Sequence, residues 1–112
     1  MTGCLFCRIA TGEIPAAVVK RQDGLLAFKE VNPQAPTHLL VIPEQHISSL
    51  NDANDPALLG AMVAFARDLA REAGISERGY RIVVNTNAAA GQTVFHLHLH
   101  LLGGRAMQWP PG

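Results

Sequence analysis

The stretch FHLHLHLL, residues 95–102, alternates histidine with leucine and so has the two-residue period of a half-buried β-strand. Successive side chains on a strand point to opposite faces, which places His96, His98 and His100 together on one face. Phe95 and the leucines are then expected to pack into the core on the other face. Histidine titrates near neutral pH and can serve as a nucleophile, a proton carrier or a metal ligand, so this row predicts a functional site.

Hydrophobic patterning predicts four further strands. Residues 18–22 and 25–29 flank Asp23-Gly24, which is a strong hairpin signal. Two more apolar runs, at residues 37–42 and 80–85, also have strand character. The second of these runs leads into a loop over residues 86–93, and the histidine row follows that loop.

One long helix is expected between the third and fourth strands. Asp55 is a suitable N-cap, Pro56 suits the first helical position, and Gly74 closes the helix. The apolar positions inside it recur with the helical period, so the helix is expected to pack on the leucine face of the sheet. These positions are Leu58, Leu59, Met62, Val63, Phe65, Ala66, Leu69, Ala70 and Ala73. Consecutive hairpin-linked strands with one main helix predict a two-layer α+β domain over residues 1–112.

Composition excludes several classes of protein. Of the 112 residues, 48% are hydrophobic and 16% charged, which is typical of a folded globular domain. Basic and acidic residues number nine each, so the basic excess of a nucleic-acid-binding protein is lacking. No apolar run is as long as a membrane span, and the N-terminus lacks a signal-peptide pattern. We therefore expect a cytoplasmic protein without nucleic-acid or membrane partners, of a size for which dimerisation commonly adds buried area.

Three explanations of the histidine row have different requirements. A purely structural role would bury three titratable rings, each of which needs a hydrogen-bond partner. A metal ion could bind two of the histidines, but the third lies on the order of 13 Å along the strand from the first. Nucleophilic catalysis explains the row better: one ring nitrogen of the central His98 attacks while an acceptor holds the other as N–H. His100 is then placed to contact the electrophile's oxygens or the leaving group.

The loop before the row carries groups suited to a phosphate. Gly91 lets backbone amides approach a ligand closely, and Gln92 and Thr93 add short-range donors. Joined directly to the histidine row, this tripeptide indicates a phosphate-binding loop.

Cys4 and Cys7 have C-x-x-C spacing, which in an intracellular chain indicates metal or redox chemistry rather than a structural disulfide. A redox pair would lie at the start of a helix in a thioredoxin-like context, which the sequence does not suggest. Zinc needs two more ligands, and His46 and His96 are free to supply them if the other histidines of the row perform chemistry. Two unpaired, partly buried thiols are the alternative.

Trp109 is the only tryptophan, and two prolines follow it directly. Prolines in that position exclude a regular helix or a central strand. We expect Trp109 to anchor an ordered tail, either on its own domain or across a dimer.

Taken together, these residues resemble the histidine triad (HIT) superfamily, whose motif alternates three histidines with hydrophobic residues as residues 96–102 do. The segments 32–43, 79–85 and 91–95 and the ending at 103–112 are similar to the Hint branch, the purine nucleoside phosphoramidases. The resemblance covers nearly the whole chain. It implies an α+β fold in which a homodimer joins two five-stranded antiparallel sheets into one.

The resemblance also implies a reaction. His98 attacks the α-phosphorus of a nucleoside 5′-phosphoramidate, a derivative of AMP or GMP, and water then hydrolyses the covalent nucleotidyl-histidine. His100 contacts the phosphate or the leaving group, and the backbone carbonyl of His96 orients His98. Catalysis requires no cofactor in this scheme, and any zinc is structural.

Further residues take roles through the same resemblance. Glu30 would hold the ribose hydroxyls, His38 would support the histidine network, and Trp109 would reach the neighbouring subunit's site. The residues that would shape the phosphate pocket are Asn85, Gly91, Gln92, Thr93 and Val94. Some relatives bind zinc through two cysteines and two histidines, at positions that match Cys4, Cys7, His46 and His96.

Two departures from the family pattern concern the ligand. Ala88–Ala90 replaces a stretch that is usually more polar and glycine-rich, and Glu30 is one methylene longer than the usual aspartate. Nucleotidyl transferases of the superfamily carry glutamine in place of His100, so the histidine favours a hydrolase. The alternatives are a dinucleoside polyphosphate hydrolase of the Fhit-like branch, a nucleotide-binding interaction module, and a redox or metal-handling protein built on the two cysteines.

Overall fold

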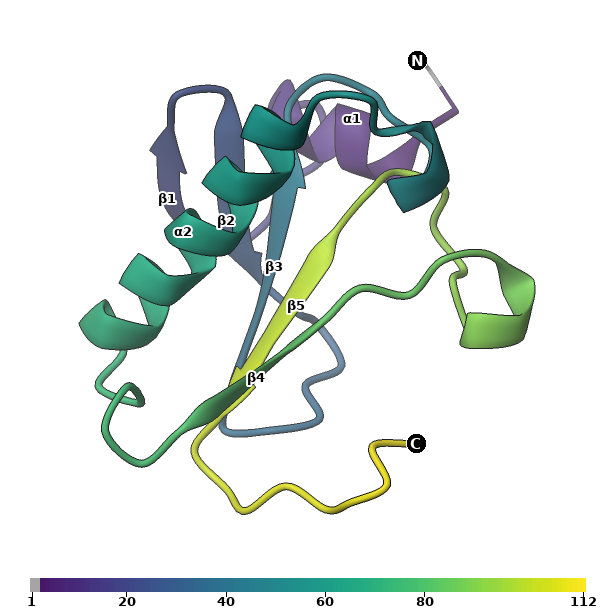
Figure 1. The fold of residues 1–112 in the computed structure, drawn as a ribbon. Helices are drawn as coiled ribbons and strands as arrows, with labels where there is room; N and C mark the ends of the chain where they lie inside the picture. The colour runs from purple at the N-terminus through teal and green to yellow at the C-terminus, as the bar shows by residue number, and fades with distance from the viewer. Residues whose placement is uncertain (1–2) are drawn as a thin grey trace.

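An antiparallel sheet forms the frame of the computed structural model, which describes residues 3–112 (Figure 1). Within those residues the sheet has five strands in the order β1-β2-β3-β5-β4. The strands are β1 (Val18–Gln22), β2 (Leu25–Lys29), β3 (Thr37–Pro43), β4 (Tyr80–Val83) and β5 (Leu99–Gly103). Two helices, α1 (Leu5–Ala10) and α2 (Pro56–Glu72), and short 3-10 turns at Leu50–Asp52 and Ala88–Ala90 complete the fold.

The first two strands and α2 agree with the sequence prediction. Asp23 and Gly24 form the β1–β2 turn with positive φ angles of 51° and 79°. The Asp55 side chain accepts the Ala57 N–H at 3.0 Å, and Gly74 has the left-handed φ of 76° that ends a helix. Both termini of α2 are therefore determined by local residues.

The connection between β3 and β4 runs through α2, as predicted, and the sequence did not indicate that β5 lies between the two strands. Since β3 and β4 are each antiparallel to β5, they run parallel to one another, with α2 as the crossover and β5 between them. The ladder places His100 opposite Leu40 of β3 on one side and Val83 of β4 on the other. β5, which lies between β3 and β4, is mostly buried, whereas β4 is half-buried and forms an edge of the sheet.

The histidine row is only partly strand. The ladder with β3 stops at the Val41–Leu99 pair, and before it the Leu97 N–H bonds to the Ile47 carbonyl of a loop at 2.6 Å. The alternation of side chains between the two faces nevertheless persists. Leu97 packs beneath α2 on one face, and His96 and His98 are buried on the other. The prediction that Phe95 lies in the core is wrong: it is 49% exposed, since the chain there has not yet entered the sheet.

Two hydrophobic clusters lie on the two faces of the sheet. The larger joins α2 to the leucines of the histidine row, as predicted, through Met62, Phe65, Ala66, Leu69 and Ala70. Val63 and Ala73 belong to the predicted apolar positions of α2 but are exposed. The smaller cluster packs Phe6 and Ile9 of α1 against Leu26, Phe28, Leu40 and Ile42.

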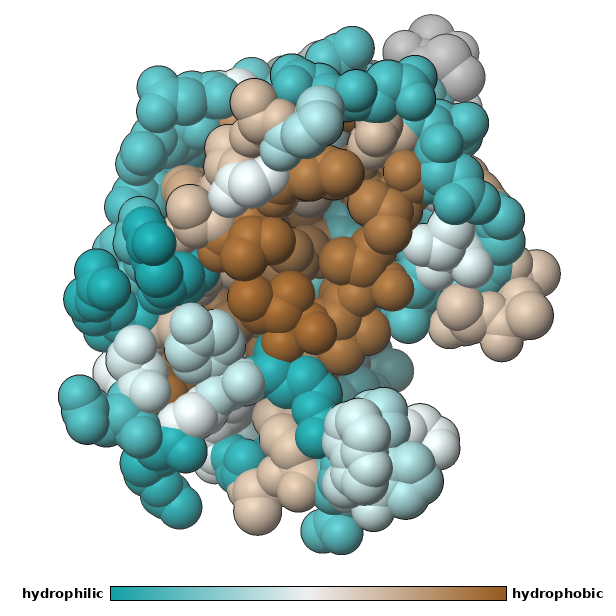
Figure 2. Space-filling model, in the orientation of Figure 1, coloured by the Kyte–Doolittle hydropathy of each residue, from teal (hydrophilic) through white to brown (hydrophobic). Residues whose placement is uncertain are grey.

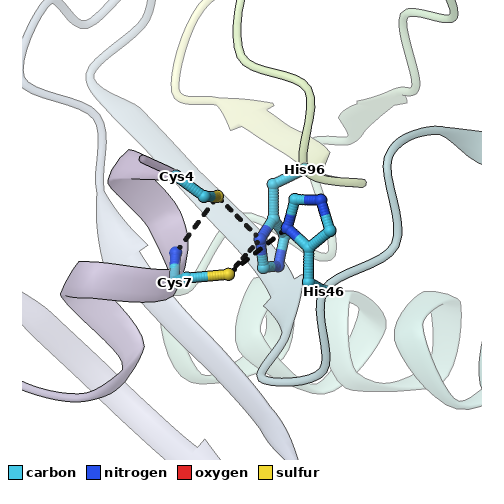
Figure 3. A group of neighbouring side chains, drawn as sticks. All are labelled: Cys4, Cys7, His46 and His96. Carbon is cyan, nitrogen blue, oxygen red and sulfur yellow. Dashed lines mark hydrogen bonds between the residues drawn. The ribbon is translucent and has the colours of Figure 1, made fainter. Parts of the chain in front are cut away.

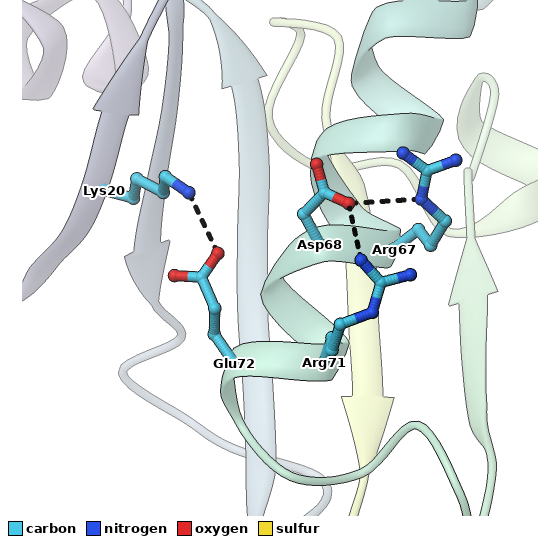
Figure 4. A network of polar contacts seen from close by, with 5 residues as sticks. All are labelled: Lys20, Arg67, Asp68, Arg71 and Glu72. Carbon is cyan, nitrogen blue, oxygen red and sulfur yellow. Dashed lines mark hydrogen bonds and ion pairs between the residues drawn. The ribbon is translucent and has the colours of Figure 1, made fainter.

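The predicted strand at 80–85 ends at Val83, and α1 was not predicted at all. At six residues α1 is too short to give a periodic signal, and it is held by its tertiary contacts. The ion pairs around α2 are exposed, including Lys20–Glu72 at 2.9 Å, and contribute little to stability (Figure 4). None of the helices within residues 3–112 has the length and hydropathy needed to cross a membrane.

Candidate active site and metal centre

A cavity of about 600 Å³ lies against the histidine face of the sheet. Its apolar wall comes from α1, through Leu5, Phe6 and Ile9, and from Phe28 and Leu40 of the sheet. Glu30 lies at the end of β2 and also lines it. His98 and His100 form the polar end of the cavity, so a ligand with one flat apolar part and one anionic part matches this lining.

His98 is fixed in one orientation. Its Nδ1 lies 2.7 Å from the carbonyl oxygen of His96, and a carbonyl only accepts, so Nδ1 carries the proton. The Phe6 ring meets the imidazole edge-to-face with centroids 5.1 Å apart. In the neutral ring, Nε2 therefore keeps its lone pair, which is what a nucleophile requires.

His100 and His38 form a second pair, with Nδ1 of His100 2.8 Å from Nε2 of His38. Burial, followed by the nearby charges of His98 and His38, lowers the pKa of His100 to about 4. Burial also lowers the pKa of His38, partly offset by the carboxylate of Glu30. Both rings are consequently neutral at pH 7, and a neutral ring presents one donor and one acceptor.

The ring of His96 points away from the cavity, toward the two cysteines (Figure 3). Its Nε2 lies 2.7 Å from the Pro43 carbonyl oxygen, and its Nδ1 lies 3.3 Å from Cys4 Sγ and 3.4 Å from Cys7 Sγ. His46 completes the group, with Nδ1 3.3 Å from Cys7 Sγ. All four ligand atoms lie within 4.8 Å of one another.

This donor set fits zinc. Bonds of about 2.3 Å to sulfur and about 2.0–2.1 Å to nitrogen place neighbouring ligands of a tetrahedral ion about 3.5 Å apart. The three sulfur–nitrogen distances of 3.3, 3.3 and 3.4 Å are close to that value. Because the Pro43 carbonyl holds the proton of His96 on Nε2, Nδ1 is free to bind a metal. Four protein ligands leave no open coordination position, as in a structural site.

The cysteines occupy the start of α1, contrary to the expectation that they lie outside such a context. Cys4 is the N-cap, and its sulfur accepts the Cys7 N–H at 3.3 Å. Burial, and then Cys4, raise the pKa of the Cys7 thiol, so metal binding there would release a proton. Both sulfurs face histidines, which favours a metal centre over a dithiol exposed for exchange.

The predicted phosphate loop divides into two parts. Asn85, Gly91, Thr93 and Val94 line the cavity. The side chain of Gln92 is instead buried: its Oε1 accepts the Asn87 N–H at 2.8 Å, and its Nε2 donates to two backbone carbonyls. Gln92 therefore holds the loop together, and its side chain has no free donor for a ligand.

Glu30 lines the cavity, whereas Trp109 lies outside its lining. The Glu30 carboxylate accepts the Asn32 N–H at 3.2 Å. Trp109 is 82% exposed, and Arg81 ties the tail to β4 through the Gln108 carbonyl at 2.9 Å. Of the two predicted anchoring places for Trp109, its own domain does not bury the ring, and a dimer partner stays a prediction.

Sequence reasoning missed the contribution of α1 to the cavity. The sequence signal was the spacing of two apolar residues, Phe6 and Ile9, which are three apart and so can share one face of a helix. Both are buried in the structure. The sequence placed the cysteines correctly near two histidines but gave no reason to put Leu5 or Phe6 beside His98.

Comparison with known proteins gives a consistent result. A sequence profile of the HIT domain matches residues 11–107. The purine nucleoside phosphoramidase of Escherichia coli K12 is 45% identical over 105 residues, which are 92% of this chain and 88% of that protein. A crystal structure of a HIT family hydrolase from Legionella pneumophila Philadelphia 1 superposes with a TM-score of 0.96 at 56% identity, covering 98% of this chain and 100% of the other.

A further solved structure concerns the metal centre. A zinc-bound histidine triad family protein from Mycobacterium smegmatis has a TM-score of 0.82 at 34% identity, covering 93% of this chain and 76% of the other. The profile match spans most of the chain, and the two more similar proteins align over nearly its full length. On this evidence the chain belongs to the HIT domain family.

Proposed function

We propose that this HIT-family hydrolase cleaves the P–N bond of purine nucleoside 5′-phosphoramidates, releasing a nucleoside monophosphate and an amine. The observation that carries the proposal is the 2.7 Å contact between His98 Nδ1 and the His96 carbonyl, which leaves Nε2 as a free nucleophile. The similarity to the Escherichia coli phosphoramidase supports the choice of substrate.

The reaction has two displacement steps. His98 Nε2 forms a bond to the α-phosphorus while the P–N bond breaks, and the amine takes up a proton from solvent water as it departs. Positive charge that develops on the imidazole is stabilised by the His96 carbonyl that holds its N–H. Water then attacks the phosphorus, the bond to Nε2 breaks, the water's hydroxyl remains on the phosphate, and its other proton is released to solvent. His100 contacts the phosphate or the leaving group throughout.

The cavity suits the nucleoside part of such a substrate. A purine would lie against the apolar wall formed by α1, Phe28 and Leu40, and Glu30 would accept hydrogen bonds from the ribose hydroxyls. The phosphate would lie between the histidines and the segment containing Gly91 and Thr93. Catalysis in this scheme needs no cofactor.

We also propose a structural zinc ion bound by the cluster shown in Figure 3. The ion would join the start of α1 to two distant loops through ligands that are otherwise separate in sequence. Its chemistry would be limited to holding these segments together, since the four residues complete its coordination.

A homodimer is the proposed assembly. Figure 2 shows hydrophobic residues gathered on the face where α2 and the β4 edge lie toward the viewer. Val63 on α2 and Val84 just after β4 are exposed hydrophobic residues of these elements, and β4 has only β5 as a neighbour in the described sheet. A second copy pairing there would cover both features and bring the exposed Trp109 toward the other subunit. A cytoplasmic location stays a prediction.

The substrate class is tested by comparing kcat/KM for adenosine 5′-phosphoramidate and for a diadenosine polyphosphate. We expect faster turnover of the phosphoramidate. Preference for the polyphosphate would identify the protein as a dinucleoside polyphosphate hydrolase. AMP binding without turnover of either compound would identify a nucleotide-binding module.

A further inference from the structure

The loop that joins β2 to β3, residues 30–36, is braced by several hydrogen bonds. It begins where the Glu30 N–H bonds to the His38 carbonyl at 3.0 Å, which closes the loop at its base. The Glu30 carboxylate accepts the Asn32 N–H, and the Gln34 side chain donates to the Asn32 carbonyl at 3.1 Å. These bonds lie inside the loop and fix its shape.

The C-terminal segment braces the same loop from outside. Arg105 Nε donates to the Gln34 carbonyl at 2.9 Å. Gly104 approaches Pro36 so closely that an added Cβ would lie 2.9 Å from the Pro36 Cβ. Gln34 is thus held through its carbonyl and its side chain, and the loop through Pro36.

The backbone N–H of Gln34 donates to Nδ1 of His38 at 3.0 Å. A backbone amide can only donate there, so Nδ1 of His38 must be the acceptor. The proton of the neutral His38 ring is consequently on Nε2. That nitrogen faces His100 Nδ1 at 2.8 Å, so His100 accepts at Nδ1 and carries its own proton on Nε2.

We propose that the Gln34 backbone amide is the positioning group that sets the tautomers of His38 and His100, and through them aims an Nε2–H donor of His100 at the ligand. The inference rests on the proposed function for the identity of that ligand, a phosphoryl group or the nitrogen leaving it. The braced loop and its two prolines serve to hold one N–H group against one buried ring.

The same arrangement limits what His100 can do. A second proton on His100 Nδ1 would face the N–H of His38, and relieving this clash would put a proton on His38 Nδ1 against the Gln34 N–H. The low pKa values of both rings agree with a pair that stays neutral. His100 therefore acts as a neutral hydrogen-bond donor that stabilises developing negative charge, and it does not store a proton for the leaving group.

The test removes the backbone N–H of Gln34. Incorporating the α-hydroxy analogue of glutamine at position 34 converts the amide into an ester and removes the donor while keeping the side chain. Gln34→Pro is a second variant that also lacks the N–H. Gln34→Ala keeps the N–H and measures the effect of the lost side chain alone. Histidine ¹⁵N NMR reports which nitrogen of each ring carries the proton.

In the native protein and in Gln34→Ala, we expect His38 and His100 both to be protonated on Nε2. In the ester variant and in Gln34→Pro, both rings should show a mixture of tautomers, and kcat should fall by up to about tenfold with little change in KM, as the loss of one hydrogen bond allows.

Native His38 protonated on Nδ1, or unchanged tautomers in a folded variant without the N–H, would overturn the inference. The NMR signature is read without substrate, so its outcome is separate from failure of the phosphoramidase proposal, which would show as absent turnover in every form.

Discussion

Backbone groups, rather than carboxylates, orient the histidines of the proposed reaction. The His96 carbonyl holds His98, and the Gln34 amide holds His38 and through it His100. A carboxylate in either place would favour a charged imidazolium and repel an anionic phosphate. Uncharged partners avoid both effects, and among the described residues that line the cavity Glu30 is the one carboxylate.

The low pKa of His100 predicts a pH dependence of stability. Folding lowers this pKa from 6.5 to about 4, so between these values the unfolded chain binds more protons than the folded one. The contribution of neutral His100 to the free energy of unfolding is therefore fully present above pH 6.5 and is lost as the pH falls toward 4. We expect urea unfolding of the native protein to show a steeper loss of stability over this range than that of His100→Gln. Equal slopes for the two proteins would contradict the burial of a neutral His100.

The four candidate zinc ligands link α1 to the segments beside the cavity. Cys4 caps α1 and Cys7 lies within it, and the same helix carries Leu5, Phe6 and Ile9 of the apolar wall. Since a six-residue helix is not stable alone, its position depends on these sulfur contacts and on the packing of Phe6 and Ile9. The proposed zinc ion would thereby determine the shape of the nucleotide site without taking part in the reaction.

Removal of a ligand should reveal this link. We expect Cys7→Ser to lower the zinc content, to speed amide hydrogen exchange in α1, and to weaken AMP binding by about tenfold, equal to about 1.4 kcal/mol. Arg8→Ala is the matched control, because Arg8 lies on the same helix but pairs only with exposed Glu13. Unchanged exchange in α1 after loss of the metal would show that the helix does not depend on the cluster.

The contact between Gly104 and Pro36 predicts a large cost of one added methyl group. Gly104 has a φ of 90°, so Gly104→Ala combines backbone strain with the 2.9 Å clash and should destabilise the fold by about 2–4 kcal/mol. Gly24→Ala is the control, since Gly24 has a similar φ of 79° with open space around it. Its expected cost is only about 1–2 kcal/mol. Equal losses measured by denaturant unfolding would show that the Pro36 contact is unimportant.

Local sequence signals predicted those elements whose ends are determined locally. The β1–β2 hairpin follows from Asp23-Gly24, and α2 follows from Asp55 and Gly74. The position of β5 between β3 and β4 depends on pairing across long stretches of chain, which periodicity does not encode. The family resemblance named the candidate residues, but whether a side chain faces the cavity or the loop interior, as with Gln92, is decided by tertiary hydrogen bonds.

At the scale of the whole molecule, the sheet formed by residues 3–112 has two edge strands, β1 and β4. We expect pairing at β4, because apolar surface lies beside it on α2 (Figure 2). Val63→Glu should therefore convert a dimer into monomers in analytical ultracentrifugation. Val19→Glu is the matched control, since Val19 is 45% exposed on β1 and Val63 is 49% exposed on α2. Dissociation by the Val19 variant alone would place the interface at the opposite edge.

The proposed reaction depends on the claim that His98 is a nucleophile, with Nδ1 held by the His96 carbonyl and Nε2 free to attack. The most direct measurement is turnover of adenosine 5′-phosphoramidate by the native protein and by His98→Ala, with intact-mass analysis of quenched reactions. We predict rapid AMP release and a transient adenylyl adduct on the native chain, with both lost in the variant and a rate lower by several orders of magnitude. A folded His98→Ala protein that keeps most of its activity, or native turnover that never passes through an adduct, would contradict the account.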